Sequence, residues 1–431
     1  MSIRIPRRTL LGTGLAVAAV SGCRNGSGDA ESNTGTFALR NARIFDGDSD
    51  VDADTVIVED GTITHMGTNL AVPEGIDTVD AGGHTLVPGL IDSHVHDAST
   101  MAPATVRFGN TTQLEMGNSQ TSGMRRLRQV REDPSQYEQA DTFFASHFVT
   151  VPGGHGTQFG SVPVIKDDTD IADFMSDQFD TEPDFIKFMI DSGNAEDPRD
   201  TLTLDQARAV VEQTHAEGYL AVAHAHTWKD YRAAVEAGAD IMAHGPIGSD
   251  VDEELIAMMA DNGTVIIPTL AVVSSACDDL IFDLVDNEDL VPFLDQNQKA
   301  AIEQLGNPNC GEPGIDERFR TNVLAGVEAA YAAGIPLLVG TDLGNHNLVA
   351  GLSTFHEMQL LYLAGLSPTD ILVGATSATA DAFGLKDRGR IGKGLKADML
   401  LLDTDITEHV PRPEDIVRVW KNGYSVTREV D

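Results

Sequence analysis

Positive charge is scarce in this chain of 431 residues. Lys and Arg together number 29 against 67 Asp and Glu, which gives a formal net charge of −38, and only eight of the basic residues are Lys. A chain with so few cations cannot neutralise a phosphate backbone, so we expect no nucleic acid partner. A surface rich in carboxylates stays hydrated at high salt, where screening weakens the repulsion between like charges. The composition is therefore typical of a halophilic protein.

Cysteine is also rare, with three residues in the chain. Cys277 and Cys310 have no cysteine or histidine at the spacing of a metal-binding motif, so a cysteine metal site is not expected. Outside the cell these two residues could form a disulfide. Two buried free thiols fit the sequence as well, so both alternatives stay open.

Apolar runs long enough to span a membrane are missing. The apolar residues 10–20 follow the pair Arg7-Arg8 and end just before Cys23. Paired arginines before a short apolar stretch resemble a twin-arginine export signal, and the Val-Ser-Gly-Cys run resembles a lipobox. We expect residues 1–35 to be a lipoprotein signal and a flexible tether. The protein would then be exported by the twin-arginine route and held on the outer face of the cell membrane by lipid on Cys23 alone; a simple membrane anchor is the alternative.

Short strands separated by turns occupy both ends of the ordered sequence. Neither end has enough strands for a stable sheet, so we expect residues 36–87 and 395–431 to form one composite β-sandwich. Residues 88–394 alternate β-rich apolar runs with amphipathic helical stretches, which predicts an α/β fold with a (β/α)8 TIM barrel. The connection 274–320 is long for such a unit and predicts a helical insertion over the mouth of the barrel, as a lid would lie. The expected barrel strands are 86–92, 110–114, 143–150, 184–190, 219–224, 240–244, 264–270 and 336–341, and the clearest helices are 203–218 and 252–262.

Polar residues stand where these strands end, and barrel enzymes place their chemistry at that face. His94 and His96 are two residues apart on the first strand, so both rings face the same way and could form half of a metal site. Lys187 lies among apolar residues of the fourth strand, where burial favours the neutral amine. A neutral amine can add CO2 to give a carbamate, an oxygen ligand that can bridge two metals. His224 and His244 end the fifth and sixth strands.

Asp342 follows the eighth strand. A carboxylate at this place could bind a metal and hold the proton of a metal-bound water. His-rich ligation favours zinc, although the spacing fits manganese or cobalt as well.

This ordered set of ligands resembles that of the amidohydrolase superfamily. The flanking segments 80–92, 375–380 and 389–398 are also similar to that family, and the resemblance covers about residues 37–430. The segments 153–156, 223–226 and 241–245 resemble one branch, which holds imidazolonepropionase and the related Xaa-Pro and Xaa-Arg dipeptidases.

The resemblance implies two divalent metal ions. One would be held by His94, His96 and Asp342, the other by His224 and His244, with carboxylated Lys187 and a hydroxide bridging them and Asp342 as the catalytic acid–base group. His155, His226 and Tyr231 are candidate substrate-binding residues, or else loop residues with structural partners. No acid closely follows His224, which argues against deamination.

The sequence thus predicts an enzyme that hydrolyses an amide or peptide-like C–N bond, with a dipeptide or N-acyl amino acid as substrate. A lactonase or phosphotriesterase-like hydrolase could use the same metals, and a non-catalytic surface binding module could keep the barrel without them. A homo-oligomer is compatible with the sequence.

Overall fold

The computed structural model describes residues 33–117, 123–193, 198–248, 250–274, 279–306 and 320–430. The expected signal with Cys23, and the expected disulfide partners Cys277 and Cys310, lie outside these residues. Among the described helices, none combines the length and the apolarity that crossing a membrane requires.

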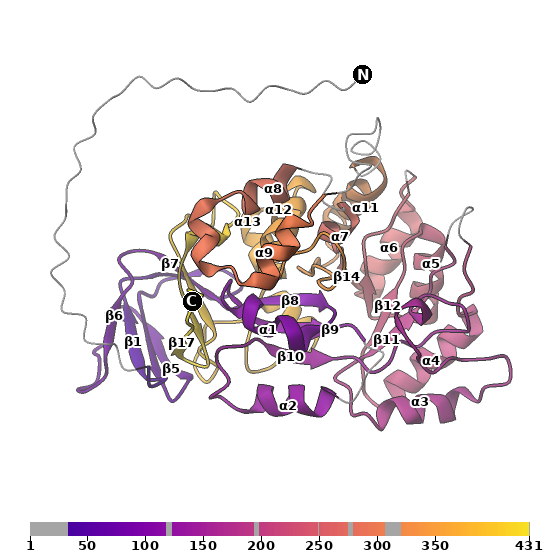
Figure 1. Cartoon of the computed structure of the whole chain (residues 1–431), viewed down its shortest axis with the longest axis horizontal. Coiled ribbons are helices and arrows are strands. Elements are labelled where there is room, and N and C mark those ends of the chain that lie inside the picture. Colours follow the sequence, from indigo (N-terminus) through magenta and orange to yellow (C-terminus); the bar gives the residue numbers. More distant parts are fainter. Residues whose placement is uncertain are drawn as a thin grey trace, which may run out of the picture. The chain divides into compact units, whose positions relative to one another are not determined.

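Two small sheets form the domain beside the barrel, and one of them combines strands from both ends of the chain. One has the order β5-β4-β1-β6 and the other the order β17-β16-β15-β7-β2-β3, in which the C-terminal strands pair with N-terminal ones. The apolar residues of the two sheets share one core, where Trp420 stacks on Phe37. Figure 1 shows β1, β5 and β6 beside β7 and β17. The bounds are β1 Phe37–Arg40, β2 Arg43–Phe45, β3 Asp50–Val51, β4 Thr55–Glu59, β5 Thr62–Gly67, β6 Thr78–Asp80, β7 Thr85–Pro88, β15 Met399–Leu402, β16 Ile416–Lys421 and β17 Tyr424–Ser425.

The barrel is an eight-membered ring of parallel segments. Its strands are β8 Leu90–Val95, β9 Asn110–Glu115, β10 Asp141–Phe144, β11 Ile186–Met189, β12 Ala221–His224, β13 Ile241–Ala243 and β14 Val265–Ile267. They form the runs β8-β9-β10 and β11-β12-β13-β14. A parallel bridge between Ala145 and Phe185 joins the two runs, and bridges from Leu337 to Ile266 and from Leu343 to Val95 close the ring through the eighth segment. The predicted (β/α)8 fold is confirmed.

The first predicted strand, 86–92, was wrong in its bounds, because it contains the boundary between the sandwich and the barrel. β7 ends at Pro88 in the sandwich, and β8 begins at Leu90 in the barrel. Gly89 lies between them, where a Cβ would come within 2.2 Å of the Thr111 hydroxyl. Only glycine allows the junction between β7 and β8 to approach Thr111 of β9 so closely.

Helices follow most barrel strands, and several of them, α3 to α6 among them, begin at a side-chain cap. Thr203 caps α4 in a capping box with Gln206, and Asp252 caps α6, so both expected helices are confirmed with these residues just outside them. The helices are α1 Ala98–Val106, α2 Met124–Glu132, α3 Ile171–Phe179, α4 Leu204–Ala216, α5 Trp228–Ala237, α6 Glu253–Asn262, α7 Leu270–Ser274, α8 Asp279–Val285, α9 Gln296–Glu303, α11 Ala325–Ala332, α12 Leu352–Leu363, α13 Pro368–Gly374 and α14 Ser377–Ala382. Short 3-10 turns are η2 Thr157–Phe159, η3 Glu288–Phe293 and η5 Pro413–Asp415, and η4 Arg320–Leu324 is a π-helical turn.

The described part of the long insertion is helical, as expected. It contains α8, η3 and α9, which gather around α12 (Figure 1). Gln298 of α9 donates to the Ala350 carbonyl just before α12. None of residues 279–306 is among those that line the mouth cavity described below, so the described part of the insertion packs on the flank of the barrel.

A buried ion cluster lies between the barrel and the sandwich. Asp141, at the start of β10, lies 2.7 Å from both Arg388 Nη1 and Lys421 Nζ and 3.2 Å from Lys396 Nζ. Burial alone would favour the neutral acid, but these cations override it and lower the pKa of Asp141 to about 2. Asp387, 2.9 Å from Arg388 Nε and 3.6 Å from Lys396 Nζ, adds a second carboxylate to this cluster.

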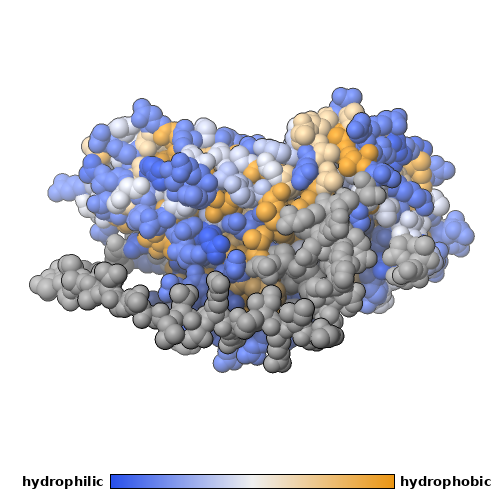
Figure 2. All heavy atoms as spheres, turned by 90° about the horizontal axis from the view of Figure 1, so that it is seen from above, coloured by the Kyte–Doolittle hydropathy of each residue, from blue (hydrophilic) through white to orange (hydrophobic). Residues whose placement is uncertain are grey.

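Most of the surface in Figure 2 is hydrophilic, and the apolar residues visible on this face gather near its centre. This pattern agrees with the excess of acidic residues in the composition.

Candidate metal centre

A cavity of about 540 Å³ opens at the carboxyl ends of the barrel strands. Every metal ligand that the sequence predicts lines it, as do His155 and His226. The remaining wall is largely apolar. The lining residues are His94, His96, Asp97, Glu115, Gly117, Phe148, His155, Phe159, Lys187, Met189, His224, His226, His244, Ile247, Val272, Val273, Asp342, Gly344 and Asn345.

The first group of ligating side chains is His94, His96 and Asp342. Oδ1 of Asp342 lies 3.2 Å from Nε2 of each histidine. β8 places the two imidazoles on one face because its side chains alternate. The hydrogen bond from the Asp342 amide to the His94 carbonyl fixes the carboxylate beside them. These three side chains are close enough together to bind one cation.

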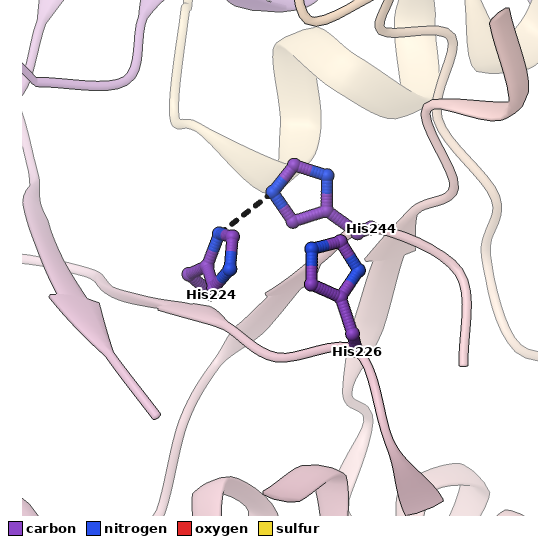
Figure 3. Close-up of side chains that lie close together, drawn as sticks. All are labelled: His224, His226 and His244. Carbon is purple, nitrogen blue, oxygen red and sulfur yellow. Dashed lines mark hydrogen bonds between the residues drawn. The ribbon is translucent and has the colours of Figure 1, made fainter. Parts of the chain in front are cut away.

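The second group is His224, His226 and His244, from the ends of β12 and β13. Nδ1 of His224 lies 2.8 Å from Nε2 of His244, the contact dashed in Figure 3, which is close enough to share a proton or a cation. One ring nitrogen of each of the three lies within 4.8 Å of the others. Figure 3 shows the His226 ring beside that of His244, and the centroids of these two rings are 4.6 Å apart.

Contacts on the far side of the rings fix their orientation. Nδ1 of His96 donates to the Gly117 carbonyl at 3.1 Å, which leaves Nε2 as the ligating nitrogen. Nδ1 of His244 contacts the Thr269 hydroxyl at 2.8 Å, so its Nε2 faces His224. Such partners set the tautomer and angle of a metal-binding histidine.

Backbone strain is concentrated at the same strand ends. His244, Thr269 and Asp342 have φ angles of 74°, 48° and 62°, in the left-handed region that non-glycine residues seldom adopt. Each such residue costs of order 1 kcal/mol, and strained residues cluster at functional sites. The conformation aims the His244 and Asp342 side chains into the cavity rather than along their strands.

Lys187 lies at the base of the cavity with 1% of its surface exposed. Within the described part of the chain its Nζ has no hydrogen-bond partner. Burial lowers the pKa of Lys187 to about 7, although the charge of Asp342 opposes that shift. A large share of this side chain is therefore neutral near pH 7.

Most of the imidazoles are held neutral, which is the form that binds metals. Burial lowers the pKa of His94 to about 3 and those of His224 and His244 well below the ordinary value, and the positive charge of Lys187 adds to the effect. His96 differs: burial disfavours its charged form, but its contacts with Asp342 and Glu115 raise its pKa to about 10. The His96 side of the cavity therefore favours positive charge, whether a proton or a metal ion supplies it.

Buried polar atoms without partners are a further sign that these residues fit a metal ion. Six buried side-chain atoms of residues that line this cavity lack a hydrogen-bond partner among the described residues: His94 Nδ1, Glu115 Oε1, Lys187 Nζ, His224 Nε2, His226 Nδ1 and Asp342 Oδ1. Buried polar atoms without partners are rare, and a cluster of them indicates an ion or group that completes the site. Imidazole nitrogens with a carboxylate oxygen are a donor set suited to zinc and similar ions.

His155 enters the cavity from the loop after β10. Its Nδ1 lies 2.8 Å from Oδ2 of Asp191, and the same carboxylate oxygen accepts from Arg199 at 2.7 Å. Nε2 of His224 is 3.8 Å from that oxygen. Asp191 thus joins a candidate substrate residue to a candidate ligand, and neither Asp191 nor Arg199 was predicted.

Glu115 was also missed. It ends β9, accepts from the Ala98 amide at 2.8 Å and lies 3.6 Å from Nδ1 of His96. It supports the orientation of His96 from the far side of the ring.

The substrate-binding role predicted for Tyr231 has no geometric support. Its side chain is fully buried within α5, does not line the cavity, and donates its hydroxyl to the His244 carbonyl. Burial raises the pKa of Tyr231, so the phenol stays protonated as this bond requires. Tyr231 holds the strained residue His244 in place from behind.

Comparison with known proteins agrees with this geometry. Residues 85–427 match the model of the amidohydrolase family. An imidazolonepropionase from Cereibacter sphaeroides is 32% identical over 117 residues, which cover 27% of this chain and 30% of that protein. Such alignments span only 14% to 30% of the length of the curated relatives.

Solved structures resemble the whole barrel and sandwich. A putative prolidase from Bifidobacterium longum has a TM-score of 0.71 at 24% identity, covering 92% of this chain and 95% of that one. A Xaa-Pro dipeptidase with bound methionine in its active site has a TM-score of 0.70 at 19% identity, and the match covers 90% of this chain and 99% of that one. At these identities the likeness establishes the fold alone.

Proposed function

Since this chain belongs to the amidohydrolase family, we propose that it is a metal-dependent hydrolase of amide or peptide-like C–N bonds. The observation that carries the proposal is Lys187, a buried amine with no hydrogen-bond partner among the described residues, in a cavity that also holds two groups of metal-ligating side chains.

In this proposal two divalent ions, with zinc favoured, occupy the two groups. His94, His96 and Asp342 would hold one ion, and His224 and His244 would hold the other. The neutral Lys187 amine would add CO2 and release a proton, and the resulting carbamate would supply oxygen ligands to the metal site. Divalent ions bound here would polarise a carbonyl oxygen and lower the pKa of a water molecule.

Asp342 is the proposed proton carrier. Burial favours the neutral form of Asp342, yet the neighbouring His94 and His96 hold its pKa well below the usual range. The carboxylate is therefore ionised and has an oxygen that can accept a proton. It takes the proton of the attacking water and returns it to the leaving nitrogen as the C–N bond breaks, so that an acid and an amine are released.

The cavity also fits a small substrate with an anionic end. Its apolar wall includes Phe148, Phe159 and Met189, which suit a side chain. The His155 ring lies 5.9 Å from that of Phe159, and the Asp191 carboxylate that it contacts also accepts from the Arg199 guanidinium. A dipeptide or N-acyl amino acid carries a carboxylate beside its scissile bond that such donors would pair.

One substrate panel tests this proposal. Dipeptides, N-acyl amino acids and lactones are offered to metal-loaded protein, and metal content is measured on the same sample. Cleavage of C–N substrates that depends on metal is expected. Lactone opening alone would support the lactonase alternative, and folded protein without metal or activity would support a binding module.

We also propose that the protein is exported by the twin-arginine route and anchored by lipid on Cys23, which the N-terminal sequence alone supports. Cys23→Ser should move the protein from the membrane fraction to the medium. Replacing Arg7-Arg8 with two lysines should leave precursor inside the cell. Membrane attachment that survives Cys23→Ser would contradict the lipid anchor.

A further inference from the structure

A third histidine stands beside the pair that ends β12 and β13. His226 follows His224 by two residues, and the centroids of their rings are 4.7 Å apart in an edge-on arrangement. Its Nδ1 is buried and has no hydrogen-bond partner among the described residues. One nitrogen of His226 lies within 4.8 Å of a ligating nitrogen of both His224 and His244 (Figure 3).

From this placement we infer that His226 is a third protein ligand of the ion held by His224 and His244. The inference rests on the proposed metal site and adds to it a donor outside the set that the family resemblance implies.

The backbone around His226 favours a fixed ligand. The His226 carbonyl accepts from the Ile247 amide, which ties it to the loop after β13. The next residue, Thr227, caps α5 by accepting from the Asp230 amide at 3.2 Å. His226 is therefore held between the end of a strand and the start of a helix, a rigid position of the kind that metal sites need.

The distances suit closure around one ion. Ligand nitrogens of a tetrahedral zinc with bonds of about 2.0–2.1 Å lie about 3.3 Å apart. His224 and His244 are already at 2.8 Å, and His226 needs to approach by at most about 1.5 Å from the 4.8 Å limit, which a small χ rotation supplies. Three imidazoles would leave the fourth position of such an ion for the Lys187 carbamate, a hydroxide or substrate.

Metal titration of the full folded domain tests the inference. Protein freed of metal by chelator dialysis is titrated with Zn²⁺ against a chromophoric chelator and with Co²⁺ under visible spectroscopy. The set is wild type, His226→Ala, His226→Gln and, as matched control, Phe159→Ala. Phe159 also lines the cavity and is 58% exposed, but it offers no ligand atom.

Wild type and Phe159→Ala should each bind two ions. Both His226 variants should lose one ion, or bind it at least about 100-fold more weakly, because an amide or a methyl group cannot replace an imidazole at zinc. Their cobalt spectra should lose intensity or shift. Far-UV circular dichroism of the metal-free proteins should be unchanged, since the described structure gives His226 Nδ1 no partner to lose.

Two outcomes overturn the inference in different ways. If both His226 variants keep two ions with wild-type affinity and cobalt spectra, and KM alone rises, His226 contacts substrate and the proposed function stands. If wild type itself binds no divalent ion, the proposed function fails first and the ligand role of His226 fails with it.

Discussion

Replacing Tyr231 with Phe should weaken metal binding without affecting substrate contacts directly. The Tyr231 hydroxyl donates to the carbonyl of His244, a residue held at a φ of 74°. Phe keeps the shape of the ring in its fully buried site. The substitution therefore removes one hydrogen bond and leaves one buried carbonyl unpaired.

The expected loss of stability follows from the removal of this one hydrogen bond. An unpaired buried acceptor costs about 1–3 kcal/mol. For a domain of roughly 400 residues, an unfolding entropy of about 2 cal/mol/K per residue converts this into a decrease of about 1–4 °C in the unfolding midpoint. Released from its anchor, His244 can also relax from its strained conformation, so the affinity of one metal should fall about 10- to 100-fold, as when other supporting partners of ligands are removed.

Calorimetry of metal-free protein and a zinc competition titration measure the two effects. In metal-saturated protein, KM should stay close to the wild-type value, because the phenol does not line the cavity. A raised KM with unchanged stability and metal affinity would refute this reasoning and restore the substrate role that the sequence suggested.

Three further predictions concern other residues. Lys187→Ala should lose at least one metal ion by elemental analysis, and short carboxylates or bicarbonate should restore part of the activity; full metal content without Lys187 would contradict the carbamate. His155→Ala should lower kcat/KM by about 1–3 kcal/mol, or 5- to 150-fold, with metal content unchanged; loss of metal would make His155 a ligand. Arg388→Met should destabilise the fold by about 3 kcal/mol or more in denaturant at pH 7, because it removes a partner of buried Asp141. The pKa of Asp141 is lowered to about 2, so its contribution to stability is present above pH 4 and lost as pH falls through 2, and this acid sensitivity should weaken in Arg388→Met.

Much of the site could be predicted because parallel strands end together. His94, His96, Lys187 and His224 all stand at or near the carboxyl end of a buried strand, and alternation along a strand decides which of them share a face. The barrel brings these ends to one rim, so a pattern read along the chain becomes a cluster in space. All four side chains line the cavity.

Asp191 could have been found by the same rule. Lys187, Met189 and Asp191 alternate along β11 and its continuation, and the first two line the cavity. A third residue in phase with them is expected on the same face. Glu115 was missed because the predicted strand stopped one residue short of it, and strand ends are the least reliable part of such predictions.

The supporting role of Tyr231 could not be predicted from the sequence. Its partner is the carbonyl of His244, 13 residues away and just beyond the end of β13, so the bond is a tertiary contact between α5 and that segment. No local pattern distinguishes a tyrosine that faces substrate from one that supports a ligand from behind. The Pro88-Gly89 junction was missed for a similar reason, since the close approach of Thr111 is a tertiary contact.

The charge of the chain decides where substrate recognition must take place. With a formal charge of −38, the surface repels a carboxylate at long range in dilute buffer and attracts the cations that the site binds. In salt near 1 M the Debye length falls to about 3 Å, so charges on the surface no longer reach the cavity. Groups that line the cavity then carry most of the remaining electrostatic recognition, and His155 is one of them. We therefore expect binding of the proposed anionic substrate to depend on such local donors rather than on the overall field of the chain.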